Sequence, residues 1–538
     1  MKIKLGLVFM MLLLVLMGAS YASDDNQTDD QLTIEEDASI EKISLENQDE
    51  LSSGGDSFTD LQDEIDTKDD VILDKNYTFD ESKDNTIVVT GEKTIDGAGH
   101  AVNANGKSGI FNVSSPKVTF KNITFLNGNG NDAGAIYFGS VGSAILENCK
   151  FINSFGQVGV IHFNGGNLTI RNCEFINVSP IFISSTADVT LNNLEFKNSQ
   201  INNVLVYVDV EGNLTLDNIS IGNITTKQDS DIVDYDYNLN RDIWRNSTGD
   251  YATGLTLISR GDVNLSNVHV NDVESLCNEY LHVDGVNINV DNVLIENSAI
   301  SNMASSTFAF SAANDFVMDD FTLKNVANSG INTTEYSYDH RKYYYDYDSR
   351  SRGGNGISVT AGRNAAITNL NITDTAGGTS TGILTVDCEN FTLNDVFIDN
   401  LYLPMETTIS YDTNLDLELY DNETSMLYSG FSFTTREKMV MNNVKVNKLM
   451  SGYIEAFNIY SKNIILTDVE VSNSHVSSHY EYPFKLNADD SLIVDAFILN
   501  NISMLEYNHT YYESGNMFGN MNPLMIMIFL EFQWLRIM

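Results

Sequence analysis

A ten-residue phrase recurs along this chain at intervals close to 25 residues. It is clearest in AILENCKFIN at 144–153 and in LTIRNCEFIN at 168–177. Each copy has an Asn or Asp at its centre, and neighbouring centres are 21 to 28 residues apart except for three intervals of 48 or 49. A period of this length predicts a solenoid, in which each repeat buries its apolar side chains against the next repeat. The central asparagines are Asn122, Asn148, Asn172, Asn193, Asn218, Asn267, Asn292, Asn369 and Asn443, and Asp320, Asp395 and Asp468 take the same place in other copies.

The apolar residues of the phrase change their spacing at its centre. Leu168 and Ile170 precede Asn172 by four and two residues, whereas Cys173 and Phe175 follow it by one and three. Alternation of apolar and polar residues is typical of a half-buried strand. The change of phase predicts that the strand bends at Asn172 and keeps its apolar side inward. Asn and Asp favour such a corner because they tolerate the left-handed backbone conformation.

Each repeat contains two further elements. A second Asn or Asp usually follows the centre by five residues, as at Asn153 and Asn177, and predicts another corner. A short apolar strand precedes the phrase, as in GAIYF from Gly134 and GVIHF from Gly159. Three strands and three corners in about 25 residues form one coil of a parallel β-helix, whose neighbouring coils lie about 4.8 Å apart. We therefore predict an all-β fold, a single-stranded parallel β-helix solenoid of about 14 coils with three strands per coil.

These phrases resemble those of secreted, adhesin-like right-handed parallel β-helix proteins of the polymorphic-membrane-protein type. In that family, Gly-Gly-Ala/Ile and Phe-x-x-Asn phrases recur in each coil. Here GAIYF with FINS, and GVIHF with FINV, match in part, because the second glycine is missing and the Phe-to-Asn spacing is one residue shorter. The resemblance covers about 91–508 and implies a right-handed coil and an adhesin-like role.

The first 22 residues are predicted to be a signal peptide. Lys2 and Lys4 precede an apolar run, and Ser-Tyr-Ala stands before Ser23. Short apolar runs with a basic start and small residues at the end are typical of secretory signals. We therefore expect an exported protein, extracellular or at the cell surface, with no integral membrane domain after cleavage.

Two segments separate the signal peptide from the repeats. Residues 23–56 hold twelve acidic residues and one lysine, which predicts a disordered spacer. At 57–90, Phe58, Leu61 and Ile65 have helical spacing and VILDKNYTF is typical of a strand. Because the open end of a solenoid needs a polar cap, we predict that 57–90 is an N-terminal helix–strand cap and that the β-helix covers 91–515. Residues 516–538 form an atypical apolar tail, either a hydrophobic cap on the last coil or an incomplete or frame-altered end.

Charge and cysteine content exclude several classes of protein. With 74 acidic and 30 basic residues, the net charge of -44 excludes most nucleic-acid roles, because nothing would neutralise phosphate. Cys149 and Cys173 hold the same repeat position in adjacent coils, and we expect the four cysteines to be small core residues rather than a disulfide scaffold. The sequence has no zinc-binding phrase, so no metal and no cofactor is predicted.

Three coils carry long insertions, predicted to form loops near 226–251, 327–355 and 402–429. In each coil the third strand is still recognisable after the insertion, from Gly254, Gly356 and Gly430. The insertions therefore leave from the same corner, on one side of the solenoid and within roughly 25 Å along its axis.

The first two insertions are rich in tyrosine, tryptophan and arginine. These residues are enriched at recognition surfaces because they offer large contact areas with few rotatable bonds. The alternative is that the loops pack on the solenoid, or that LDLELYDNE in the third insertion is an eroded extra coil. The candidate binding residues are Tyr235, Tyr237, Trp244, Tyr336, Tyr338, Arg341, Tyr343, Tyr344, Tyr345, Tyr347, Arg350 and Arg352.

An enzyme of the galacturonase type would need several acidic, His and Arg/Lys phrases on successive coils. Here Asp319–Asp320 lies inside the repeat phrase, Gly99–His100 lacks the second glycine, and Arg436–Lys438 stands alone. We therefore expect a non-catalytic, adhesin-like protein with no catalytic residues, whose insertions bind a glycan or a surface protein of another cell. A polysaccharide lyase or glycoside hydrolase is the alternative, and a structural envelope protein is the third interpretation.

Seventeen Asn-x-Ser/Thr sequons occur in the chain, for example at Asn76, Asn112, Asn167, Asn213 and Asn371. Such sequons accept N-linked glycans on exported chains. Many of them follow from a repeat that is rich in Asn and Thr.

Overall fold

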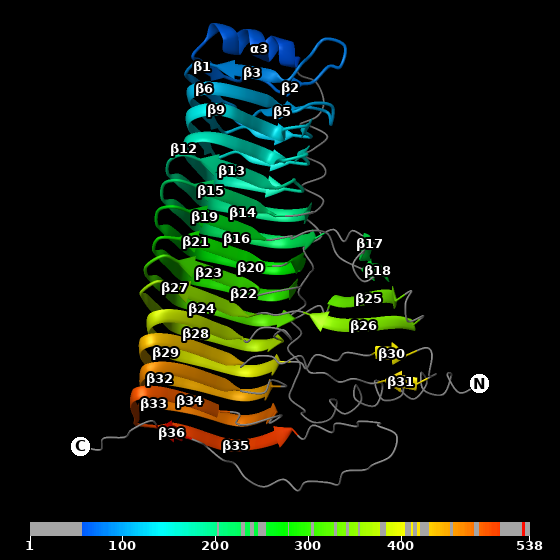
Figure 1. The fold of residues 1–538 in the computed structure, drawn as a ribbon. Coiled ribbons are helices and arrows are strands. Elements are labelled where there is room, and N and C mark those ends of the chain that lie inside the picture. Colours follow the sequence, from blue (N-terminus) through cyan, green and yellow to red (C-terminus); the bar gives the residue numbers. More distant parts are fainter. Residues whose placement is uncertain are drawn as a thin grey trace, which may run out of the picture. The chain divides into compact units, whose positions relative to one another are not determined.

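The computed structural model describes residues 56–201, 204–226, 232–236, 241–245, 254–277, 279–302, 306–327, 331–339, 344–352, 356–376, 383–403, 410–412, 417–419, 430–451, 456–477, 484–505 and 530–532. Its largest sheet has 28 strands, and every pairing between these strands is parallel. Successive strands climb the molecule as stacked coils (Figure 1). The predicted all-β, parallel β-helix fold is confirmed.

Each coil contributes to three parallel ladders. The first ladder contains the residues before the central Asn, so Val189 pairs with Leu214; the second contains the residues after it, so Leu194 pairs with Ile219. Both segments lie in long strands that pass through the corner. The third ladder is formed by the short strand before the phrase, as where Ile181 pairs with Val206. Because the register continues from coil to coil, equivalent residues of the repeat stack along the axis.

The strands from the N-terminus to the first insertion are β1 (Asp70–Ile72), β2 (Tyr77–Thr78), β3 (Ile87–Thr90), β4 (Lys93–Asp96), β5 (Ala101–Asn103), β6 (Phe111–Lys121), β7 (Thr124–Leu126), β9 (Ala133–Glu147), β10 (Lys150–Ile152), β12 (Gly159–Ile176), β13 (Ile181–Ser185), β14 (Val189–Ile201), β15 (Val206–Val210) and β16 (Leu214–Thr226). Two short strands, β8 (Asn129–Gly130) and β11 (Phe155–Gly156), pair with each other. The later strands of the 28-stranded sheet are β19 (Leu255–Ser259), β20 (Val263–Cys277), β21 (Leu281–Gly285), β22 (Ile288–Asn302), β23 (Phe308–Ala312), β24 (Phe316–Ala327), β27 (Ile357–Ala361), β28 (Asn364–Ala376), β29 (Leu384–Leu403), β32 (Phe431–Ser451), β33 (Phe457–Ser477), β34 (Phe484–Val494), β35 (Phe497–Leu505) and β36 (Leu530–Phe532).

The backbone is left-handed at the centre of every phrase identified in the sequence. The nine central asparagines and the three central aspartates have φ between 51° and 56°. The second corner is left-handed too, with φ of 50° at Asn153 and Asn177. Left-handed residues turn the chain sharply, and Asn and Asp adopt this conformation at lower cost than other L-residues.

The corner asparagines also connect the coils through their side chains. Asn218 Nδ2 donates to Asn193 Oδ1 at 2.8 Å, and Asn193 Nδ2 donates to Asn172 Oδ1 at 2.8 Å. The series continues through Asn148 to Asn122, each at 3.1 Å. An amide that both donates and accepts can repeat this contact in every coil, so the corners stabilise the stacking as well as the bend.

The interior is filled by stacked apolar side chains. Phe125, Phe151, Phe175 and Phe196 occupy one position in successive coils and are at most 1% exposed. Their ring centroids are 4.7 to 4.8 Å apart and adjacent ring planes lie within 10°. The ring spacing equals the spacing of neighbouring strands, because each phenylalanine projects inward from the same position of its coil.

The helix α3 (Phe58–Thr67) covers the N-terminal end of this core. It buries Phe58, Leu61 and Ile65, and Ser57 with Asp60 forms a capping box at its start. Asp84 is 7% exposed and accepts hydrogen bonds from the N–H groups of Phe58 and Thr59 at 3.0 and 2.9 Å. In the described part of the chain, no helix is long and apolar enough to cross a membrane.

Two predicted boundaries differ from the structure. The β-helix begins before residue 91, since β1, β2 and β3 pair in parallel with β4, β5 and β6 and so form a coil of their own. The cap is therefore α3 rather than the whole of 57–90. At the other end, β36 lies within the predicted apolar tail and pairs in parallel with β34, which extends the third ladder there. Apart from this strand, 516–538 lies outside the described residues, as do 1–55.

Cys149 and Cys173 are buried free thiols in neighbouring coils, and Cys388 is a third buried free thiol. Burial raises the pKa of the Cys173 thiol well above its usual value. The prediction for Cys277 lies outside the side chains that the structure describes.

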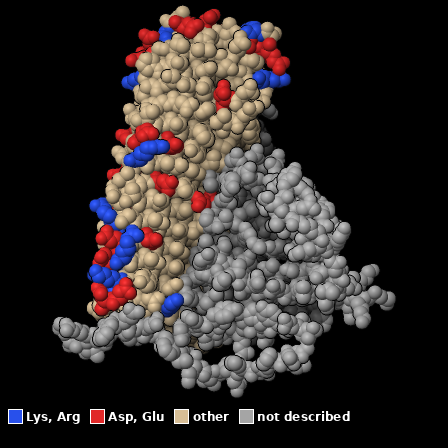
Figure 2. All heavy atoms as spheres, in the orientation of Figure 1, with Lys and Arg blue, Asp and Glu red and all other residues tan. Residues whose placement is uncertain are grey.

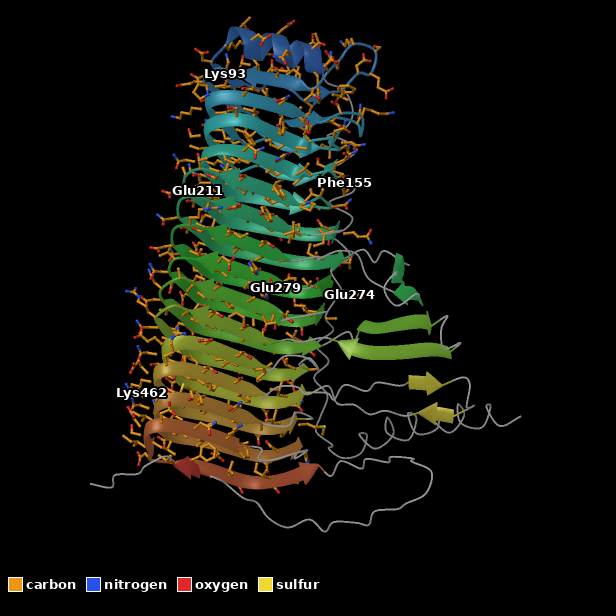
Figure 3. The ribbon with its side chains drawn as sticks, viewed as in Figure 1. Lys93, Phe155, Glu211, Glu274, Glu279 and Lys462 are labelled. Atoms are coloured by element: carbon orange, nitrogen blue, oxygen red, sulfur yellow. The ribbon has the colours of Figure 1, made fainter. Side chains whose placement is uncertain are left out.

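Replacing Phe175 by alanine is expected to destabilise the fold. The side chain is fully buried between two other rings, so truncation removes its transfer free energy and leaves a cavity, at a cost of about 3–5 kcal/mol. Chemical denaturation followed by circular dichroism measures this loss. Phe155→Ala is the matched control, because Phe155 is 42% exposed on the solenoid surface (Figure 3), and its midpoint should stay close to that of the unmodified chain.

The corner can be tested at Asn193, which is not part of a sequon. Asn193→Ala should cost about 1–2 kcal/mol for the left-handed backbone, in addition to the lost amide contacts. Asn193→Gly keeps the backbone free to adopt the observed φ of 52° and should cost less. Equal unfolding midpoints for the two variants would show that the backbone conformation is not the source of the corner's preference.

Candidate binding surface

All three long insertions leave at the corner between the second and third ladders. They lie between β16 and β19, between β24 and β27, and between β29 and β32. The third ladder continues across them without a change of register, as where β15 pairs with β19 through Val206 and Leu255. The insertions therefore add residues at one corner without altering the coil that follows.

Two of the insertions form a single small sheet rather than separate loops. The first contains β17 (Ile232–Asp236) and β18 (Arg241–Arg245), and the second contains β25 (Ile331–Asp339) and β26 (Tyr344–Arg352). All three pairings, including the one between β18 and β25, are antiparallel. The order is β17-β18-β25-β26 (Figure 1), so the sheet joins insertions whose coils are three intervals apart in the solenoid. We call it the inserted sheet.

The register of the inserted sheet collects aromatic residues on one face. Trp244 lies opposite Tyr336, which lies opposite Tyr347. Tyr338 lies opposite Tyr345 in the neighbouring row of that face. Residues directly opposite each other share a face, and so do residues two apart along a strand. The aromatic face therefore holds six of the candidate binding residues, namely Tyr235, Trp244, Tyr336, Tyr338, Tyr345 and Tyr347.

The opposite face is charged. Tyr344, Arg350 and Arg352 belong to it, together with Arg241 and Arg245 and with acidic residues of β17, β25 and β26. The nine candidates that the structure describes thus separate into six on the aromatic face and three on the charged face. Tyr237, Arg341 and Tyr343 lie outside the described residues.

The third insertion contributes a separate hairpin. Strands β30 (Ser410–Asp412) and β31 (Leu417–Leu419) pair antiparallel, and β30 lies beside β26. Antiparallel pairing contradicts the interpretation of LDLELYDNE as an eroded coil, since a coil of this solenoid would pair in parallel.

The aromatic face is large enough for an extended ligand. Four strands with neighbours about 4.8 Å apart span about 14 Å, and its two aromatic rows are about 7 Å apart along the strands. Among the residues of these two rows, Asp242 is the one that is charged. Aromatic residues with few charges favour stacking on apolar faces over ion pairing.

The solenoid carries a group of carboxylates that the sequence analysis did not interpret as a site. Oxygen atoms of Asp291, Asp319 and Asp320 lie within 4.8 Å of one another. One oxygen of Asp319 accepts from Asn369 Nδ2 at 2.9 Å and from the backbone N–H of Asp320 at 3.0 Å. Carboxylate oxygens are the ligands that hard cations take. The group itself follows from the repeat, which places Asp291 and Asp319 opposite each other in successive coils.

His282 lies on the third ladder between two carboxylates. Its Nε2 is 3.1 Å from Asp284 and its Nδ1 is 2.5 Å from Glu279, which Figure 3 labels on the solenoid. Hydrogen bonds to Asp284 and Glu279 raise the pKa of His282 to about 10, against the effect of partial burial. The imidazole is therefore protonated at neutral pH and belongs to an ion-paired cluster. A group held as a cation in this way is poorly suited to act as a general base.

An aromatic column also lies on the outer side of the third ladder. Tyr137, His162, Phe182 and Tyr207 occupy one position in successive coils. Phe182 and Tyr207 stack with centroids 4.4 Å apart, and His162 packs edge-on against Phe182 at 5.8 Å. Burial lowers the pKa of His162. The short apolar strands before each phrase already contain these aromatic residues and His162 in the sequence. Only the register of the third ladder shows that they lie next to one another.

Acidic and basic side chains gather along one edge of the solenoid (Figure 2), and Figure 3 places Glu211 and Lys462 there. Arg260 contacts Asp209 and Glu211 at 2.7 and 3.3 Å, and Lys462 contacts Glu437 at 3.2 Å. Exposed ion pairs of this kind contribute little to stability.

The residues considered for a galacturonase-type enzyme lie in separate coils. Asp319 pairs with Asp291 and Thr368 in the first ladder. His100 lies next to a corner of one of the first coils, where its N–H donates to Gly97. Arg436 lies 3.5 Å from Asp387 near the third ladder. The structure does not bring these three residues together.

Comparison with known proteins supports the fold. The family model described as "Right handed beta helix region" matches residues 65–225. With the parallel ladders described above, this match identifies the chain as a right-handed parallel β-helix repeat protein.

A search of curated proteins found no match. One similar solved structure is the A-module of the mannuronan C-5 epimerase AlgE6 from Azotobacter vinelandii, with 12% identity and a TM-score of 0.24 over 85% of this chain and 97% of that one. A likeness at this TM-score carries no argument about activity.

The protonated His282 predicts a specific dependence of stability on pH. Its folded pKa of about 10 lies above the unfolded value near 6.5. Its contribution to stability is therefore fully present below about pH 6.5 and is lost as the pH rises through about 10. The difference in melting temperature between the chain and His282→Gln should shrink between these values. A difference that stays constant over this range would contradict the raised pKa.

Proposed function

We propose that this chain is a non-catalytic, adhesin-like protein, exported to the cell surface or the extracellular space, that binds a glycan or a surface protein of another cell. The β-helix serves as a stiff support and the inserted sheet as the contact surface. The observation that carries the proposal is the register that places six aromatic residues on one face of that sheet.

A neutral glycan is the ligand that this surface fits best. Tyrosine and tryptophan offer flat apolar faces with a polar edge, which suits a sugar ring with an apolar face and a rim of hydroxyl groups. The net charge of -44 opposes a polyanionic ligand through long-range repulsion. The same aromatic residues are enriched at protein interfaces, so a protein ligand is the alternative that an experiment has to separate.

Replacing the aromatic face should abolish binding without unfolding the solenoid. In a glycan-array and whole-cell binding assay with the purified chain, Trp244→Ala and Tyr336→Ala are each expected to weaken binding at least tenfold, as for hot-spot residues that contribute about 2 kcal/mol. Tyr344→Ala is the matched control, because the register places Tyr344 on the charged face. Its binding should remain close to that of the unmodified chain.

Three results would contradict the proposal. Equal losses for Tyr344→Ala and Trp244→Ala would show that the aromatic face has no special role. Loss of the β-rich circular dichroism spectrum in the Trp244 variant would show that the residue packs rather than binds. New reducing ends or unsaturated products from a panel of polysaccharides would show that the chain is an enzyme.

A further inference from the structure

Ten of the Asn-x-Ser/Thr sequons that the structure describes fall into two groups that the sequence does not distinguish. In the first group the side-chain amide of the asparagine donates to a side chain of the preceding coil. These contacts are Asn122 to Asp96 at 2.9 Å, Asn177 to Asn153, Asn218 to Asn193 and Asn223 to Asn198 at 2.8 Å, Asn390 to Asn364 at 3.1 Å and Asn501 to Asn473 at 2.9 Å. The Nδ2 atom of each of these six therefore faces the preceding coil.

The asparagines of the second group lie on strands and corners, and their side-chain amides take no part in the asparagine contacts between coils. Asn112, Asn167, Asn213 and Asn264 are exposed, and within the described structure none of their Nδ2 atoms donates a hydrogen bond. Asn213 uses only its Oδ1, which accepts from the backbone N–H of Asp262 at 2.9 Å. The nitrogen to which a glycan would be attached is therefore free in all four.

We propose that the exported chain carries N-linked glycans at Asn112, Asn167, Asn213 and Asn264. The six asparagines of the first group, which we call the ladder asparagines, remain unmodified in the folded protein. The inference rests on the export that the signal peptide predicts, and it does not depend on the ligand of the inserted sheet.

The reaction needs a lipid-linked oligosaccharide as the donor. Asn Nδ2 forms a bond to C1 of the first sugar and loses one proton. The bond between C1 and the phosphate oxygen of the lipid carrier breaks, and the oxygen leaves with the electron pair. No oxidant or reductant takes part.

The close stacking of the coils excludes a glycan on the ladder asparagines for a steric reason. Neighbouring coils are about 4.8 Å apart, and a sugar on Asn218 Nδ2 would occupy the space where Asn193 Oδ1 accepts its hydrogen bond. A glycan there would separate the two coils and break the parallel pairing on both sides of the corner. A chain glycosylated at this position should fail to complete the solenoid.

The proposed glycans would also lie away from the corner that carries the insertions. Asn167 and Asn213 stand just before Leu168 and Leu214, at the corner between the third and first ladders, and Asn264 lies in the first ladder. The insertions leave between the second and third ladders. Glycans at these three positions would cover other sides of the rod and leave that corner uncovered.

Mass spectrometry of intact glycopeptides tests this division on the chain purified from its natural source. We expect glycans at the four exposed asparagines and bare peptides at the six ladder asparagines. Asn112→Gln and Asn167→Gln should each lower the mass by one glycan and leave the melting curve unchanged. Asn218→Gln should leave the mass of the glycans unchanged and lower the melting temperature, because it removes a corner and a ladder contact.

The proposal is overturned by a glycan on any of the six ladder asparagines in the folded protein, or by bare peptides at all four exposed positions. It is also overturned if Asn218→Gln lowers the glycan mass. None of these results bears on binding by the inserted sheet, which the aromatic substitutions test separately.

Discussion

The left-handed asparagine corner is the constraint on which the rest of this structure depends. At each corner held by asparagine, one residue both bends the strand and offers an amide that can donate to one neighbouring coil and accept from the other. Aspartate supports the bend but cannot donate. Where aspartate holds a corner, the amide of the next coil can bond to a different residue. Asn369, for example, donates to Asp319 rather than to the central Asp320. The repeat therefore accepts either residue for its shape, but needs asparagine for a continuous ladder.

Because the corners determine where each strand begins, the coils remain in register even when a corner gains many residues. The third ladder runs from β15 to β19 and from β23 to β27 although an insertion separates each pair in sequence. The entropy of closing a loop grows only slowly with its length. A solenoid can thus carry hairpins at one corner at little cost to its core, and hairpins from coils three intervals apart can pair with each other.

The two aromatic arrangements in this chain have different consequences. In the column on the third ladder, the rings of Phe182 and Tyr207 stack on each other, so the two ring faces that meet are occupied. That column contributes to packing between coils. On the inserted sheet the aromatic residues are spread over four strands and two rows, which makes a broad face rather than a single file. This difference is why we place the proposed contact surface there.

The sequence by itself determined the coil, because the Asn centres, the change of phase at Asn172 and the period near 25 residues are local signals that each repeat restates. It also identified the residue types of the candidate surface and the corner from which the insertions leave. Only the tertiary structure decided that β18 pairs with β25, which residues share the aromatic face, and which sequon amides are held in the ladder. The physical reason is that these depend on contacts between residues far apart in the chain, whose register no local pattern contains.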